Sequence, residues 1–130
     1  MKHISNLAKR YKNWKKILTK FETYEKYKQI YLELTELLGL HTEYLGNQWR
    51  AWYQTHDFVF SFLDKEDDVR LEVPRNVMLK SYMEEPRFFD YVDMVGYSKR
   101  KIFNTVIPLV GRYKELLEEA KINKANEDFQ

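Results

Sequence analysis

Apolar side chains recur at steps of three and four residues from Ile4 to Leu38. Such steps place residues on one face of a helix. A first run ends at Phe21, and a second begins at Tyr24, out of phase with the heptad of the first. The pattern predicts two helices, over about 5–20 and 24–38, joined by a tight turn near Glu22. One long bent helix is the alternative. The first run consists of Ile4, Leu7, Tyr11, Trp14, Leu18 and Phe21.

The middle of the chain continues these steps with strongly aromatic residues. The spacing predicts a third helix over 42–63. The segment 58–63, FVFSFL, is equally compatible with a buried strand, because periodicity does not separate the two. Alternation over 69–73 is compatible with a short extended segment. The apolar face of the predicted helix consists of Leu45, Trp49, Trp52, His56, Val59 and Leu63.

Proline, glycine and serine mark the ends of further predicted helices. Proline suits the first position of a helix, so segments 74–84 and 86–96 are each predicted to be helical. Ser98 is predicted to cap a last helix. Within that helix Pro108 lacks a backbone donor, so a kink or a restart is expected there. Gly39 is predicted to end the helix over 24–38.

Together these elements predict an all-α protein. Residues 1–40 are expected to form a basic helix-turn-helix arm, and residues 41–130 a C-terminal core resembling a four-helix bundle. A length of 130 residues fits one domain with an appended arm. No run approaches the roughly 20 apolar residues that span a bilayer, and the N-terminus lacks the pattern of a signal peptide. A soluble, intracellular protein is therefore expected.

Charge is segregated along the chain, although the net charge is only +2. Residues 1–28 carry nine basic and two acidic side chains, whereas residues 29–93 carry six basic and thirteen acidic ones. The remaining residues, 94–130, carry seven basic and five acidic side chains. This distribution predicts an arm that contacts a polyanion and an acidic body that does not.

The basic arm is the strongest functional signal in the sequence. Residues 2–21 contain seven Lys or Arg and no Asp or Glu. An ordinary surface helix mixes both signs to gain ion pairs, so nucleic-acid contact is favoured over a merely solvated face. Because most of the cations are lysines, we expect contacts with phosphates that are independent of base sequence. The predicted DNA-binding residues are Lys9, Arg10, Lys12, Lys15, Lys16 and Lys20.

The apolar face of the same segment requires a protein partner, because this helix alone has nothing to bury it against. We expect it to pack against another subunit. Stacking of Tyr11 and Trp14 on unpaired bases is the alternative. The predicted subunit-packing residues are Leu7, Tyr11, Trp14, Leu18 and Phe21.

Signals for catalysis or for metal binding are weak. Arg50 and His56, with five residues between them, resemble the short signature of the HEPN family of helical ribonucleases, in which the pair supports cleavage of RNA. A half-buried histidine on an apolar face is the alternative. The chain has no cysteine, which excludes disulfides, thiolate sites and a cysteine nucleophile. No enzymatic activity, cofactor or metal site is predicted.

One segment of the arm carries a resemblance to a known family. The sequence AKRYKNWKKILTKF, over 8–21, contains Arg10-Tyr11-x-x-Trp14 followed by Phe21 in a lysine-rich setting. It resembles the N-terminal region of major coat proteins from rod-shaped and filamentous double-stranded DNA viruses of archaea, the rudiviruses and lipothrixviruses. The rod-shaped members have cores rich in small residues and prolines or serines near the start. The filamentous branch therefore fits this chain better.

The resemblance implies a structural capsid protein. Arms from paired subunits would wrap linear double-stranded DNA in the A-form, and the bodies would form helical bundles on the outside of a helical nucleoprotein filament. Subunits of this family pair as homodimers or as heterodimers of two paralogous coat proteins, and some members add a lipid envelope. The expected location is the virion, and the host cytoplasm before assembly. The alternatives are a cellular architectural DNA-binding protein and a HEPN-like ribonuclease.

Overall fold

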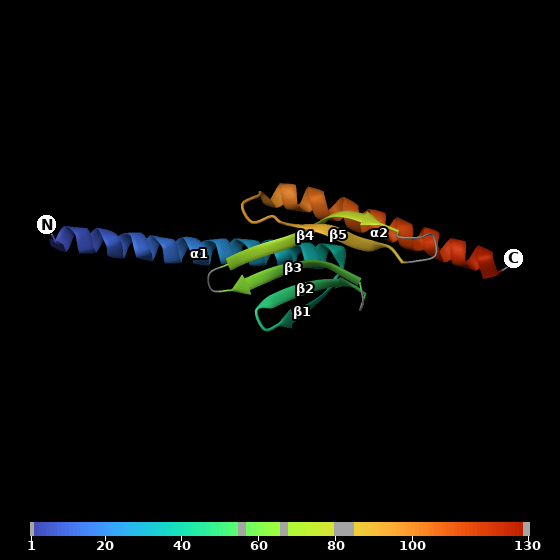
Figure 1. Cartoon of the computed structure of the whole chain (residues 1–130), viewed down its shortest axis with the longest axis horizontal. Coiled ribbons are helices and arrows are strands. Elements are labelled where there is room, and N and C mark those ends of the chain that lie inside the picture. The colour runs from blue at the N-terminus through green and yellow to red at the C-terminus, as the bar shows by residue number, and fades with distance from the viewer. Residues whose placement is uncertain (1, 55–56, 66–67, 80–84, 129–130) are drawn as a thin grey trace.

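Two long helices and a five-stranded antiparallel sheet make up the described part of the chain (Figure 1). This computed structural model describes residues 2–54, 57–65, 68–79 and 85–128, with the backbone alone for 2–9, 11–19, 65 and 128. In chain order the elements are α1 (Lys2–Leu38), β1 (His41–Leu45), β2 (Gln48–Tyr53), β3 (Asp57–Lys65), β4 (Asp68–Met78), β5 (Arg87–Asp93) and α2 (Lys99–Asp128).

The prediction of an all-α fold with a four-helix-bundle-like core is wrong. The protein has an α+β fold, in which five consecutive strands form an antiparallel sheet in the order β1-β2-β3-β4-β5. One helix precedes the sheet and one follows it. A sheet that packs one face against helices can bury the aromatic residues that the core of a helical bundle would otherwise have buried.

Both helices pack on one face of the sheet, where the core lies. Tyr31 of α1 is fully buried, with ring centroids 5.2 Å from Phe60 and 6.3 Å from Phe62, both on β3. Tyr113 of α2 stacks on Phe88 of β5 at 4.8 Å. The N-terminal half of α1 extends beyond one side of the sheet and the end of α2 beyond the other, so the termini lie at opposite ends of the molecule (Figure 1).

The helix predicted over 42–63 is replaced by β1, β2 and β3. Both faces of these strands carry aromatic rings: Trp49 contacts a tyrosine of α1, whereas Trp52 contacts Phe58 on the opposite face. This arrangement conceals the alternation of a half-exposed strand, although aromatic residues favour strands. Gly46, with φ of 67°, and Asn47 form the two-residue turn between β1 and β2, which is a recognised hairpin signal.

The helices predicted over 74–84 and 86–96 are also wrong, because these segments contribute to β4 and β5. Residues 80–84 lie outside the described part of the chain. Pro74 lies inside β4 and is buried, and Pro86 directly precedes β5. Proline disfavours the helical conformation of the residue before it, so these prolines mark extended chain here rather than helix starts.

The predicted helix ends at Gly39 and Ser98 are confirmed. Gly39 follows α1 with φ of 64°, and the amide of Leu40 donates to the carbonyl of Thr35 at 2.9 Å. This geometry is typical of a glycine-terminated helix. Ser98 precedes α2, and its Oγ accepts a hydrogen bond from the amide of Lys101 at 3.1 Å, as an N-cap residue does.

Each long helix is continuous. The tight turn predicted near Glu22 is wrong, because α1 runs from Lys2 to Leu38 as one helix, in line with the long-helix alternative. The last helix likewise continues through Pro108 without a restart. In α2, core residues on both sides of Pro108 pack against the sheet, and in α1 the packed residues from Tyr24 onward support a helix that continues toward the N-terminus.

Buried tyrosines reach from the helices to loops and strands at the edge of the core. The Tyr27 hydroxyl donates to the carbonyl of Tyr97 at 3.0 Å and accepts from the amide of Gly96 at 2.7 Å. The Tyr31 hydroxyl lies 2.6 Å from Oγ1 of Thr42 on β1. Each tyrosine therefore buries its ring and still satisfies its polar end.

Replacing Tyr27 with Phe is expected to lower the free energy of unfolding by about 1–3 kcal/mol, because two backbone groups lose their partner. Urea denaturation followed by circular dichroism measures this change. The matched control is Tyr44→Phe, since Tyr44 is 49% exposed and its substitution should change the free energy by less than about 0.5 kcal/mol. Equal effects of the two substitutions would contradict the proposed role of the Tyr27 hydroxyl.

Candidate functional site

The cationic segment of the sequence lies in the part of α1 that extends beyond the sheet (Figure 1). We call residues 2–21 the cationic arm. Arg10 and Lys20, whose side chains are described, are both exposed. Among the described side chains of α1, the first to pack against the core is Tyr24. The other predicted DNA-binding residues have side chains outside the described part of the chain: Lys9, Lys12, Lys15 and Lys16.

The apolar positions of the arm and those of the packed half fall on different sides of the unbroken α1. At about 100° per residue, the arm's apolar positions are rotated by roughly 150° from the buried run that contains Tyr27, Tyr31 and Leu34. Phe21 is 60% exposed, whereas Tyr31 and Leu34 are 0% exposed. The sheet therefore covers the second run and leaves Phe21 uncovered. The side chains of Leu7, Tyr11, Trp14 and Leu18 lie outside the described part.

The cationic positions of the arm lie mainly on the side opposite to its apolar positions. Positions 9, 12, 16 and 20 fall within an arc of roughly 80°, in the direction that faces the sheet further along α1. One side of the arm is thus cationic and the other apolar. A polyanion and a protein partner can bind these two sides without competing for the same surface.

The pair of residues that resembled a ribonuclease signature is not in a helical setting. Arg50 lies in β2, and its Nη2 donates to Oε1 of Gln48 at 3.2 Å. His56 lies outside the described residues. The helical arrangement on which that resemblance rested is therefore absent around Arg50.

A second candidate site arises where β3 and β4 separate. Their pairing ends at Ser61 and Glu72, although β4 continues to pair with β5. The carbonyl of Leu71 points toward β5, since it accepts from the amide of Met94 at 2.8 Å. Backbone groups alternate sides along a strand, so Pro74 faces β3, where it has no N–H to donate. The missing donor explains why the ladder stops there.

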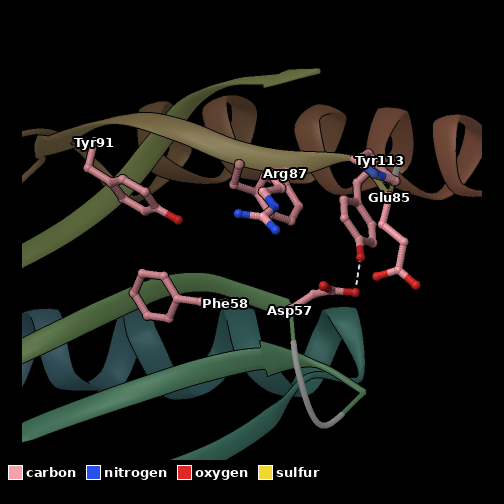
Figure 2. A pocket seen from close by; sticks show the side chains of 8 residues that line it. Asp57, Phe58, Glu85, Arg87, Tyr91 and Tyr113 are labelled. Atoms are coloured by element: carbon pink, nitrogen blue, oxygen red, sulfur yellow. Dashed lines mark hydrogen bonds between the residues drawn. The ribbon is translucent and has the colours of Figure 1, made fainter. Parts of the chain in front are cut away.

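A pocket of about 740 Å³ lies beside this separation, between the start of β3, the start of β5 and α2 (Figure 2). We call it the Asp57 pocket. Figure 2 shows Tyr113 pointing toward Asp57 and Arg87 extending between them and Tyr91. No local motif in the sequence marks this site, because its residues come from three separate elements. The lining consists of Asp57, Phe58, Glu85, Pro86, Arg87, Phe88, Tyr91 and Tyr113.

The Asp57 pocket combines charged and aromatic side chains. The Tyr113 hydroxyl donates to Oδ2 of Asp57. Burial raises the pKa of Tyr113 above its usual range, and the Asp57 carboxylate raises it further. The hydroxyl is therefore a protonated donor at neutral pH and is not a base. Among the described residues, no group of three or more His, Cys, Asp or Glu is placed to hold a metal ion.

Comparison of the chain with protein-family models, with curated proteins and with solved structures found no match. Neither of the two described helices contains an apolar stretch long enough to cross a membrane.

The raised pKa of Tyr113 predicts a loss of stability in alkali. The folded protein holds the phenolic proton more tightly than the unfolded chain, so this contribution is complete below pH 10.0, the ordinary pKa, and is lost as the pH rises above it. Tyr31, whose burial raises its pKa to about 12, adds to the same trend. Urea denaturation above pH 10.0 should show the free energy of unfolding falling by about 1.4 kcal/mol per pH unit for each such tyrosine.

In Tyr113→Phe, the free energy of unfolding should fall less steeply above pH 10.0, by about 1.4 kcal/mol per pH unit. At neutral pH, Tyr113→Phe also removes the donor to Asp57 and should cost about 1–2 kcal/mol. An unchanged alkaline slope in Tyr113→Phe would contradict the assignment.

Proposed function

We propose that this protein binds nucleic acid, with duplex DNA as the main candidate, through the cationic arm and without regard to base sequence. The observation that carries the proposal is the acid-free run of seven basic residues on a helix that continues beyond the folded body. Twenty helical residues span roughly 30 Å, about the length of nine base pairs, so one arm reaches several phosphates. Exposed Arg10 lies near the middle of this span, and exposed Lys20 lies near its C-terminal end.

Lysine side chains make the interaction ionic and insensitive to base sequence. Each lysine is a point cation for phosphate oxygens, whereas base reading in the grooves depends mainly on Arg, Asn and Gln. If one arm neutralises about six phosphates, the logarithm of the binding constant should fall with the logarithm of salt concentration at a slope near −5. Binding of this kind is weak for one subunit and gains from several arms acting together.

The apolar side of the arm supports pairing with another subunit, either a second copy of this chain or a related protein. Phe21, at 60% exposed, is the described member of the run. Two arms that pack their apolar sides together would place their cationic sides outward, where both can meet phosphates. This arrangement accounts for apolar and basic residues that alternate in one helix.

The coat-protein function implied by the resemblance remains a prediction that depends on the arm alone. The helical-bundle body that accompanied it is wrong, because the body contains a five-stranded sheet. A cellular architectural DNA-binding protein with the same arm is the alternative. Regular filaments on linear DNA would favour the coat, and discrete particles the alternative.

Neutralising three arm lysines, Lys12→Gln with Lys15→Gln and Lys16→Gln, is expected to weaken binding to a random-sequence DNA duplex by about 100-fold at low salt. The slope of affinity against salt should change from about −5 to about −3, because three phosphate contacts are lost. Fluorescence anisotropy at several salt concentrations measures both quantities.

The matched control replaces three lysines of α2 that are exposed, namely Lys101, Lys121 and Lys124, with Gln. This variant loses the same net charge but leaves the arm intact, so its salt slope should stay near that of the parent protein. An equal loss in both triple variants would show that net charge, and not the arm, determines binding.

Replacing Trp14 and Leu18 of the arm with Ser tests subunit pairing separately. The double variant should keep the salt slope, because every cation remains, but it should lose cooperativity in a DNA titration. Electron microscopy should then show scattered particles in place of any filaments that the parent protein forms. Retained cooperativity would contradict pairing through the apolar side of the arm.

A further inference from the structure

A second, smaller pocket lies on the face of the sheet opposite the helices. Its volume is about 360 Å³, and we call it the Ser61 pocket. It adjoins the place where β3 and β4 separate, since the last paired residues of β3 and β4, Ser61 and Glu72, both line it. It is separate from the cationic arm. Its other lining residues are Gln48, Arg50, Trp52, Phe58 and Tyr91.

Two residues that line this pocket each carry a buried polar atom with no hydrogen-bond partner among the described residues. The two atoms are Oγ of Ser61 and Nε1 of Trp52. Ser61 is only 1% exposed. A buried polar group without a partner is destabilising, and native proteins satisfy most such groups. Two of them in residues that line one pocket therefore suggest that something else supplies their partner.

The polar groups of the Ser61 pocket are mostly donors. The indole of Trp52 can only donate, and the hydroxyl of Ser61 can donate as well. Arg50 donates to Oε1 of Gln48 at 3.2 Å, which leaves the amide NH₂ of Gln48 as a further donor. The one carboxylate, Glu72, lies 3.9 Å from the guanidinium of Arg70. A ligand group that fits this wall must accept several hydrogen bonds and must be compatible with the guanidinium cation of Arg50.

The remaining walls of the pocket are aromatic. Phe58 lies between Trp52 and Tyr91, with ring centroids 5.5 Å from each. Flat apolar surfaces of this kind bind planar rings. The volume is near the lower end of the roughly 300–1,000 Å³ usual for ligand pockets, so a ligand with one ring fits better than a larger one.

We infer that the Ser61 pocket binds a small aromatic carboxylate. Its ring packs against Phe58 and Tyr91, and its carboxylate accepts hydrogen bonds from Ser61, Trp52 and Arg50. Both polar atoms, Oγ of Ser61 and Nε1 of Trp52, are closed off from solvent. The carboxylate of a ligand can therefore reach these two atoms only when an aromatic side chain of the pocket rotates. Tyr91, at 37% exposed, is the wall residue with the most freedom to do so.

Benzoate is the probe that tests this inference, and the indole N–H resonances of the tryptophans report on binding. Benzoate should shift the Trp52 indole resonance in a saturable titration, because that N–H gains an acceptor. The Trp49 resonance should move little, because Trp49 lies on the opposite face of β2 against Tyr31. Spectra of Trp52→Phe assign the signal. Benzylamine, a cation of similar shape, should bind at least tenfold more weakly.

The variant Ser61→Ala should weaken benzoate binding by about tenfold, since one hydrogen bond to a charged group is lost. Its stability should be equal to or higher than that of the parent protein, because the hydroxyl it removes has no partner among the described residues. Glu72→Gln should bind benzoate more tightly, because it removes a like charge.

Three outcomes would overturn the inference: no saturable shift at Trp52, equal binding of benzoate and benzylamine, or binding that Ser61→Ala leaves unchanged. None of these results depends on DNA. DNA binding by the Ser61→Ala variant should match that of the parent protein, so failure of this inference is distinguishable from failure of the nucleic-acid proposal.

Discussion

The packing of α1 against β3 is the interaction on which the rest of this structure depends. Tyr31 fits against Phe60 and Phe62 with no exposed surface, and Tyr24 lies 5.6 Å from Phe62. A short helix rich in like charges gains little stability on its own, because nucleation is costly and the charges repel. The packed half of α1 supplies that nucleus, so the arm needs only to extend a helix that already exists. Core and arm are therefore parts of one element.

The backbone N–H that Pro74 lacks determines where the pairing of β3 with β4 ends. Pro74 stops the ladder between β3 and β4, while β4 and β5 remain paired beyond it. The first residues of β3 are thereby released from β4. Phe58 and Tyr91 meet across this region at 5.5 Å, and both line the Asp57 pocket and the Ser61 pocket. The two pockets are thus neighbours, and both lie where the pairing of β3 with β4 ends.

The sequence predicts where the two long helices adjoin the sheet better than it predicts the sheet itself. Gly39 and Ser98 act locally, through a left-handed backbone and a side-chain cap, so their roles are visible without knowledge of the fold. The strands are not visible from the sequence in this way, because aromatic residues on both faces of β2 and β3 give a spacing that resembles that of a helix. The Gly46–Asn47 turn was the available signal for a hairpin. The arm is a contiguous segment and could be proposed from sequence, whereas the pockets join residues from strands that only the sheet brings together.

If the arm binds a polyanion as proposed, the charge of the body affects where that polyanion can lie. Phe62 packs near Tyr24 and Phe60 near Tyr31, so β3 runs opposite to α1 and its end points toward the arm. The strand carries Asp64 toward that end, and β4 begins with Asp68, whose carboxylate is paired with the guanidinium of Arg70 at 2.8 Å. If the arm holds a duplex as proposed, the carboxylate of Asp64 would repel phosphates that approach this end of the sheet. Under that proposal, attraction along the arm and repulsion at its base would together limit how far the duplex advances toward the body.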